Sequence, residues 1–146
     1  MPLGDVPISR KDVRQALASG LTTALTAAQA VYRYQKSDFS QQSPVVRVYS
    51  SGSERPAMTA RGIRSKFFFT VELWVLYANG TTWDEEDAED AMDTLEQQVM
   101  GYVANNQVTT TWTTLRYGRP STLGNVTVGG APYLVEEIVL VAEVYG

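Results

Sequence analysis

Carboxylates are the side chains of this sequence that could do chemistry, because Cys and His are both missing. The 146 residues contain 16 Asp and Glu but no Cys and no His. That composition excludes disulfides, Cys/His zinc sites, thiol nucleophiles, Ser-His-Asp triads and His general bases. The chemistry left to consider is that of paired carboxylates and of a Ser-Lys dyad.

Paired carboxylates for glycoside hydrolysis could come from Glu72, Glu136 or Glu137, with Trp74 or Trp112 stacking on a sugar. Glu136 and Glu137 are adjacent in an expected strand, so they point to opposite faces and cannot flank one bond. No catalytic pair is indicated, but a small carboxylate-dependent cell-wall hydrolase stays open as an alternative function.

A Ser-Lys dyad could use Ser65 and Lys66, and their spacing alone does not refute it. The acidic run DEEDAEDAMD (84–93) lacks the central Gly of a calcium loop, and a helix would splay its carboxylates around the axis. The glycine-containing stretch GSERPAMTARG lacks the GK[ST] ending of a phosphate-binding loop. We therefore expect no metal site and no cofactor.

Charge divides the chain into two unlike parts. Residues 1–66 carry ten Lys and Arg against four acids, whereas residues 67–146 carry two Arg against twelve acids. The parts have net charges of +6 and -10, which sum to the overall -4. Such asymmetry can mean that the basic region of one subunit meets the acidic region of another, or simply that two surfaces are solvated. Nucleic-acid binding is disfavoured by the pI of about 4.8.

The length suits one domain, residues 1–146, and the start of the chain shows no secretion signal. The first expected element is an N-terminal helix, segment 8–29, with Ser9 as its cap and a helical apolar pattern over 10–29. Gly20 on its apolar face would permit close approach of another element. Two short strands, 30–35 and 45–50, follow.

Residues 50–65 predict a long mobile loop, because they are rich in Ser, Gly, Arg and Pro and have neither helical nor strand periodicity. The loop and its exit are basic through Arg55, Arg61, Arg64 and Lys66. Loops longer than about 12 residues are often functional, so this one is a candidate contact element. A tolerated surface insertion is the alternative.

Two long strands, 67–77 and 133–145, each have one apolar face and one mixed face. The mixed face holds Phe68, Trp74, Val139 and Val141, which is too apolar to be left to water. A helix of the same chain or a neighbouring subunit could cover it. Trp74 is therefore a candidate interface residue.

A second helix is expected over 82–104, opened by Thr82 and Glu85. Its outer face carries Glu86, Glu89, Asp90 and Asp93, and its opposite stripe is apolar. Strands are also expected at 109–117 and 126–128. The order of elements predicts an α+β fold with a small mixed, mainly antiparallel sheet and two packed helices.

The order of these parts resembles the tail terminator, or tail-completion, proteins of long-tailed bacteriophages. The resemblance is carried by the N-terminal helix, the basic loop leading into FFFTVELWVLYAN, the acidic helix WDEEDAEDAMDTLEQQV and the closing GGAPYLVEEIVLVAEVY. It spans most of residues 8–146. These are architectural signals without a catalytic motif.

The resemblance implies a tail-terminator-like or tail-tube-like fold and a virion protein without catalytic residues. It implies a homo-oligomeric ring, typically six-fold, that caps the finished tail tube and joins it to a head-completion (stopper) protein. Double-stranded DNA would pass only as cargo, no membrane would be involved, and assembly would occur in the host cytoplasm. A tail-tube or head-tail connector subunit is the alternative among assembly proteins. Expected interface residues are Arg55, Arg61, Arg64, Lys66, Trp74, Glu86, Glu89, Asp90 and Asp93.

Overall fold

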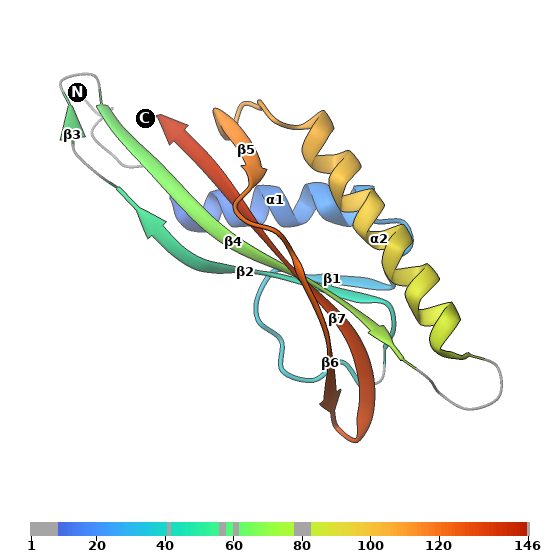
Figure 1. Ribbon diagram of the computed structural model, residues 1–146. Helices are drawn as coiled ribbons and strands as arrows, with labels where there is room; N and C mark the ends of the chain where they lie inside the picture. The colour runs from blue at the N-terminus through green and yellow to red at the C-terminus, as the bar shows by residue number, and fades with distance from the viewer. Residues whose placement is uncertain (1–8, 41, 56–57, 60–61, 78–82, 146) are drawn as a thin grey trace.

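The computed structural model describes residues 9–40, 42–55, 58–59, 62–77 and 83–145 (Figure 1). In chain order the elements are α1 (Arg10–Ala24), β1 (Ala30–Tyr32), β2 (Val45–Glu54), β3 (Met58–Thr59), β4 (Gly62–Leu76), α2 (Glu85–Asn105), β5 (Thr114–Tyr117), β6 (Thr122–Val128) and β7 (Ala131–Tyr145). None of the helices in these residues is long and apolar enough to span a membrane.

The strands form one mixed, mainly antiparallel sheet, as predicted. The main order is β1-β2-β4-β7-β5, with β3 also pairing with β4 and β6 also pairing with β7. The β1–β2 pair is parallel, and the other pairs are antiparallel. Since β5 and β6 pair with successive parts of β7, they share one edge of the sheet.

The two predicted long strands are the centre of the sheet. β4 and β7 each have 15 residues and pair from Arg64–Tyr145 to Leu76–Tyr133 without a break. Fifteen extended residues span about 50 Å. The strands are therefore long enough to project beyond the part of the sheet that the helices cover (Figure 1).

The prediction of a long loop over 50–65 is wrong for most of that segment. β2 continues to Glu54 and β4 already begins at Gly62, so Gly52 pairs with Phe68 and Glu54 with Lys66. The register shifts between Ser50 and Gly52, which marks a β-bulge that absorbs one residue. Composition indicated a loop, but backbone hydrogen bonding to β4 makes this segment the end of a hairpin.

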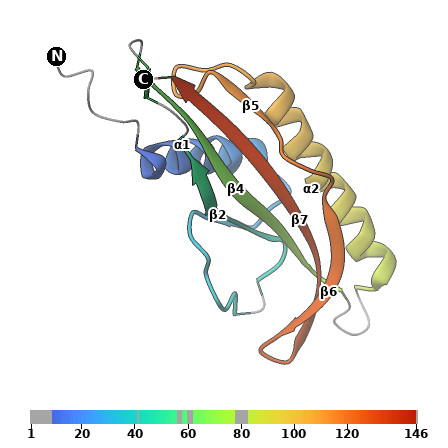
Figure 2. The same cartoon turned by 60° about the vertical axis from the view of Figure 1, so that its left-hand side comes forward.

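Both helices pack on the same face of the sheet (Figure 2). The alternating residues of β4 from Phe67 to Val75 are buried beneath them, as the predicted apolar face requires. The helices contribute apolar stripes to the same core. Its main members are Val13, Leu17, Leu21, Val46, Val48, Phe67, Phe69, Val71, Leu73, Met92, Leu95, Val99, Ile138 and Leu140.

Helix α1 begins as predicted but ends earlier, at Ala24 rather than at residue 29. The Ser9 hydroxyl accepts a hydrogen bond from the Asp12 backbone N–H, which confirms the cap. At the other end, the Gln98 side chain of α2 bonds both the Ala27 N–H and the Thr26 hydroxyl. These contacts from α2 satisfy polar groups of the turn that follows the helix.

Close contact between the helices occurs at Gly20, as predicted. A Cβ atom at Gly20 would lie 2.2 Å from the Tyr102 hydroxyl oxygen. The missing side chain therefore provides the space that Tyr102 occupies against α1.

Helix α2 begins at Glu85, and its capping box differs from the predicted one. Asp84 is the N-cap: its side chain accepts from the Asp87 N–H, and the Asp87 carboxylate accepts from the Asp84 N–H. The predicted start at Thr82 lies outside the described residues. The reciprocal pair that satisfies the first turn is thus formed by two aspartates.

The predicted strand 109–117 shortens to β5, Thr114–Tyr117. The Thr109 hydroxyl accepts from the N–H groups of Thr111 and Trp112, which makes a local turn instead of a strand. The Trp112 indole donates to the Asn106 carbonyl at the end of α2. Local side-chain bonds therefore take the backbone groups that a longer strand would use.

Candidate functional site

The candidate carboxylates are distributed over both faces of the sheet. Glu136 lies on the helix-covered face, whereas Glu72 and Glu137 lie opposite each other on the other face of β4 and β7. Glu137 is paired with Arg119 at 2.6 Å, and Glu72 is paired with Arg47. Each carboxylate of the facing pair thus has its own arginine, which offsets the repulsion expected between like charges on adjacent strands.

Ser65 and Lys66 do not form a dyad. Ser65 is buried opposite Val144, which belongs to the helix-covered core, and Lys66 lies opposite Glu143 on the other face. Successive residues of a strand point to opposite faces, so the amine cannot activate the hydroxyl.

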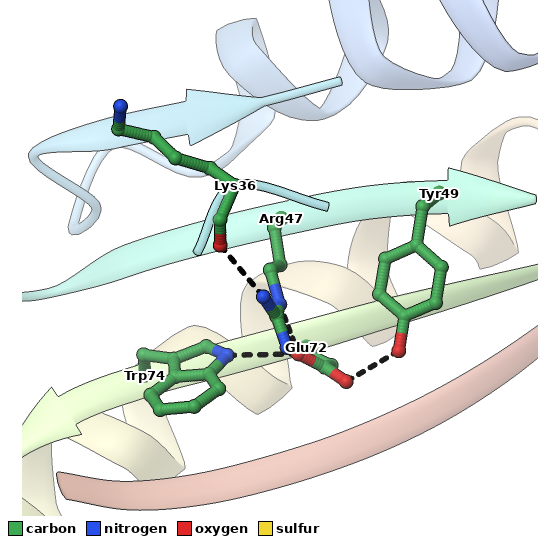
Figure 3. A network of polar contacts seen from close by, with 5 residues as sticks. All are labelled: Lys36, Arg47, Tyr49, Glu72 and Trp74. Carbon is green, nitrogen blue, oxygen red and sulfur yellow. Dashed lines mark hydrogen bonds and ion pairs between the residues drawn. The ribbon is translucent and has the colours of Figure 1, made fainter. Parts of the chain in front are cut away.

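Glu72 is the centre of a buried polar network (Figure 3). Its carboxylate accepts hydrogen bonds from Arg47 Nε, from the Tyr49 hydroxyl and from Trp74 Nε1. Burial, followed by the hydrogen bond to Glu72, raises the pKa of Tyr49 and keeps it a donor. Because both oxygens of Glu72 accept hydrogen bonds from side chains of the same chain, the network holds Arg47, Tyr49 and Trp74 in place around this carboxylate.

Arg47 connects this network to the segment between β1 and β2. Its Nη1 donates to the Lys36 carbonyl at 2.6 Å, and its guanidinium carbon lies 5.0 Å from the Trp74 ring centre (Figure 3). We call residues 33–40 and 42–44 the cover segment. Arg47 is not among the residues predicted from the sequence, where its one signal is a charged side chain inside an apolar strand.

The cover segment explains the burial of Trp74, which is 4% exposed. Phe39 lies on it, with ring centres 5.0 Å from Trp74 and 5.9 Å from Tyr133. The prediction that a helix or a neighbouring subunit covers Trp74 is therefore wrong. Phe39 was missed because it is a single apolar residue in a polar stretch, and neither strand nor helix periodicity marks it.

The expected basic residues gather at the far end of the β2–β4 hairpin. Arg64 pairs with Glu143 of β7 at 2.7 Å, and that hydrogen bond is the main reason why the pKa of Glu143 is lowered. Lys66 lies between Glu54 of β2 and Glu143 of β7 in the register. Arg55 follows β2 directly and lies 5.0 Å from the Phe67 ring centre. Arg61 falls outside the described residues.

The acidic face of α2 is exposed at all four predicted positions, Glu86, Glu89, Asp90 and Asp93. Within the described part of the chain, these four side chains make no ion pair. Burial, and then the charges of Glu96 and Asp93, raise the pKa of Glu136 beneath the helix. The outer side of the helix therefore carries four exposed carboxylates that form no ion pair with the described residues.

Neither the facing carboxylates of β4 and β7 nor the acidic face of α2 gathers ligands for a metal ion. Among the described residues, no group of three or more Asp or Glu side chains could hold one. The structure instead presents an acidic face on α2, and basic residues that alternate with Glu54 and Glu143 at the end of the β2–β4 hairpin. Contact of the basic and acidic residues with another subunit remains a prediction.

Comparisons with known proteins give a structural match only. No protein-family model matches the chain, and no curated protein matches it by sequence. Among solved structures, the chain is similar to the sheath/tube terminator of PVC, an extracellular contractile injection system, in the extended state, with a TM-score of 0.54 at 13% identity. That match covers 94% of this chain and 57% of the terminator chain, so the chain spans little more than half of the terminator's length.

A second solved structure is a chain from the virion of a native gene transfer agent particle. This match has a TM-score of 0.49 at 12% identity, and it covers 93% of this chain and 92% of the chain from the particle. The comparison with the terminator confirms the predicted tail-terminator-like fold.

Proposed function

We propose that the chain is a structural subunit of a phage tail or related particle, and that it forms a ring that ends the tail tube. The observation that carries this proposal is the structural similarity of 94% of the chain to a sheath/tube terminator. The chain contributes the sheet and its two helices to such a ring. A terminator needs surfaces for its own copies and for the tube. The acidic face of α2 and the basic residues at the end of the β2–β4 hairpin suit that requirement.

The partners follow from the same role. They are further copies of this chain, arranged with six-fold symmetry, the tube protein on one side and a head-completion protein on the other. Double-stranded DNA passes through the ring as cargo. The end of the β2–β4 hairpin, with Arg55, Arg64 and Lys66, is proposed to contact the tube or the next subunit.

Deletion of the gene that encodes this chain, in the strain that produces the particles, tests the proposed role. We expect tubes of irregular length and no complete particles, and we expect a plasmid copy of the gene to restore both. Particles with tails of normal length and full yield after the removal would refute the proposal.

A turnover assay on peptidoglycan addresses the hydrolase alternative. We expect no release of sugars or peptides by the purified chain. Turnover that the Glu137→Gln substitution abolishes would instead assign the facing carboxylates to catalysis.

A further inference from the structure

Strand β6 is an edge strand without the usual protection against pairing. Its seven residues, Thr122–Val128, pair with β7 in unbroken register and include no charged residue, no Pro and no bulge. Leu123 is 58% exposed and Val126 is 44% exposed. Within the described part of the chain, no strand lies on the outer side of β6 (Figure 2). Such an edge is a template for a strand of another chain.

A second unpaired edge lies at the opposite side of the sheet. β1 pairs only with Val45–Arg47, so the rest of β2, from Val48 to Glu54, has no strand beside it among the described residues. Helix α1 runs along this edge on the helix-covered face. Arg10 Nη1 lies 2.9 Å from the Ser53 hydroxyl, and Arg14 Nη1 lies 3.3 Å from the Ser50 hydroxyl.

The helices near the two edges carry opposite charges: α2, on the side of β6, is acidic, and the start of α1, on the side of β2, is basic. α2 contains seven Asp and Glu and no Lys or Arg. Just before α2, Trp83 donates to the Leu76 carbonyl at 2.6 Å, and Leu76 is in register with Tyr133, the partner of Val126. The acidic half of α2 thus lies level with β6, whereas Arg10 and Arg14 lie at the β2 edge.

We propose that β6 of one copy pairs antiparallel with the Val48–Glu54 edge of β2 in the next copy, which continues the sheet from subunit to subunit. This inference rests on the proposed ring and identifies its contact. The strand directions follow from the ladder, because β2 and β6 run in opposite directions within one sheet. Since both helices lie on one face, the acidic α2 of one copy then meets the basic start of α1 in the next.

Charge selects this pairing over a symmetric one. Pairing β6 with β6 would place two acidic α2 helices side by side, and like charges across an interface are unfavourable. Pairing β6 with β2 joins unlike surfaces, which is the head-to-tail contact that closes a ring.

The two edges lie at different positions along the strand direction, so neighbouring copies cannot pair side by side without an offset. β6 lies opposite residues 131–137 of β7, while the free edge of β2 is level, through β4, with residues 138–143. Neighbouring copies are therefore offset along the strands by about 20 Å. A closed arrangement of tilted strands requires an offset of this kind.

Cross-linking tests the contact directly, because the chain has no cysteine of its own. Asn125→Cys chains, with the new thiol at the middle of β6, are mixed with Ser51→Cys chains and treated with a short bismaleimide. We expect a cross-linked dimer from the mixture and none from Asn125→Cys alone. No dimer from the mixture, or equal cross-linking by Asn125→Cys alone, would overturn the proposed pairing.

Substitutions on the edge give a second measurement on the full chain. Leu123→Lys places a positive charge on β6, facing the basic α1 of the next copy, and should weaken self-association at least tenfold in sedimentation experiments. Val108→Lys is the matched control, because Val108 is 73% exposed and lies outside both edges. Equal association of the two variants, or a wild-type chain that stays monomeric at all concentrations, would overturn the inference.

Failure of this contact is distinguishable from failure of the proposed function. If Leu123→Lys assembles normally but removal of the chain still disrupts tail length, the ring role stands and the contact is wrong. If the β6–β2 cross-link forms but removal of the chain leaves normal particles, the contact stands and the terminator role is wrong.

Discussion

Arg47 and Glu72 lie directly opposite each other on β2 and β4 and form an ion pair almost sealed from solvent. Their side chains are 13% and 8% exposed. Glu72 also accepts from Tyr49 and Trp74, and Arg47 also donates to the Lys36 carbonyl. The pair thus connects the sheet to the cover segment, and its charges are balanced by several hydrogen bonds rather than by each other alone.

Removal of one charge from this pair should be costly. Glu72→Gln leaves the Arg47 guanidinium buried without its counter-charge, and we expect the free energy of unfolding to fall by about 3 kcal/mol. Glu137→Gln breaks the more exposed pair with Arg119 and should cost less than about 1 kcal/mol. Urea unfolding of both variants measures the difference. Equal losses would mean that the buried network contributes no more than a surface pair.

Phe39 should be essential for the cover of Trp74. Phe39→Ala removes a buried ring from the aromatic cluster, and we expect a loss of about 3–5 kcal/mol together with a shift of tryptophan fluorescence to longer wavelength. Tyr34→Ala, at an exposed position of the same segment, should cost much less. Full stability of the Phe39→Ala variant would show that another part of the chain shields Trp74.

The two helical glycines should respond in opposite ways to alanine. Gly101 has open space around it, so Gly101→Ala should stabilise the protein by about 0.5–1 kcal/mol through helix propensity. Gly20→Ala would overlap the Tyr102 ring and should destabilise by about 1–3 kcal/mol. Thermal and urea unfolding test the pair. Stabilisation by both substitutions would mean that Tyr102 moves aside without cost.

Glu136 should make stability depend on pH. Burial raises its pKa, so the folded chain holds this proton more tightly than the unfolded chain. Its contribution to stability therefore falls as pH rises from the ordinary glutamate value of 4.5 through the raised folded pKa. Glu136→Gln removes this loss, so we expect the variant to be more stable than the wild type at pH 8 and to lose that advantage near pH 4.

Unfolding of the two proteins at both pH values tests this expectation. Glu89→Gln, on the exposed face of α2, is the control for removal of a negative charge. A Glu136→Gln variant that is less stable than the wild type at pH 8 would show that its hydrogen bond with Ser121 outweighs the burial of the charge.

Local pattern was sufficient for the elements whose residues repeat at a regular period. The alternation of β4 and β7, the apolar stripes of α1 and α2 and the Ser9 cap could all be predicted, because periodicity and capping are properties of neighbouring residues. The mixed, mainly antiparallel sheet followed from the order of those elements. The absence of Cys and His from these 146 residues is likewise read from the sequence alone.

Tertiary structure decided the features that depend on residues far apart in the chain. The Ser- and Gly-rich end of β2 is a strand because β4 supplies its hydrogen-bond partners, and Phe39 is buried because Trp74 and Tyr133 meet beneath it. The end of α1 depends on Gln98 of α2. Only the fold places the acidic helix beside one free edge and the basic helix beside the other, since sheet order is set by long-range pairing and not by local composition.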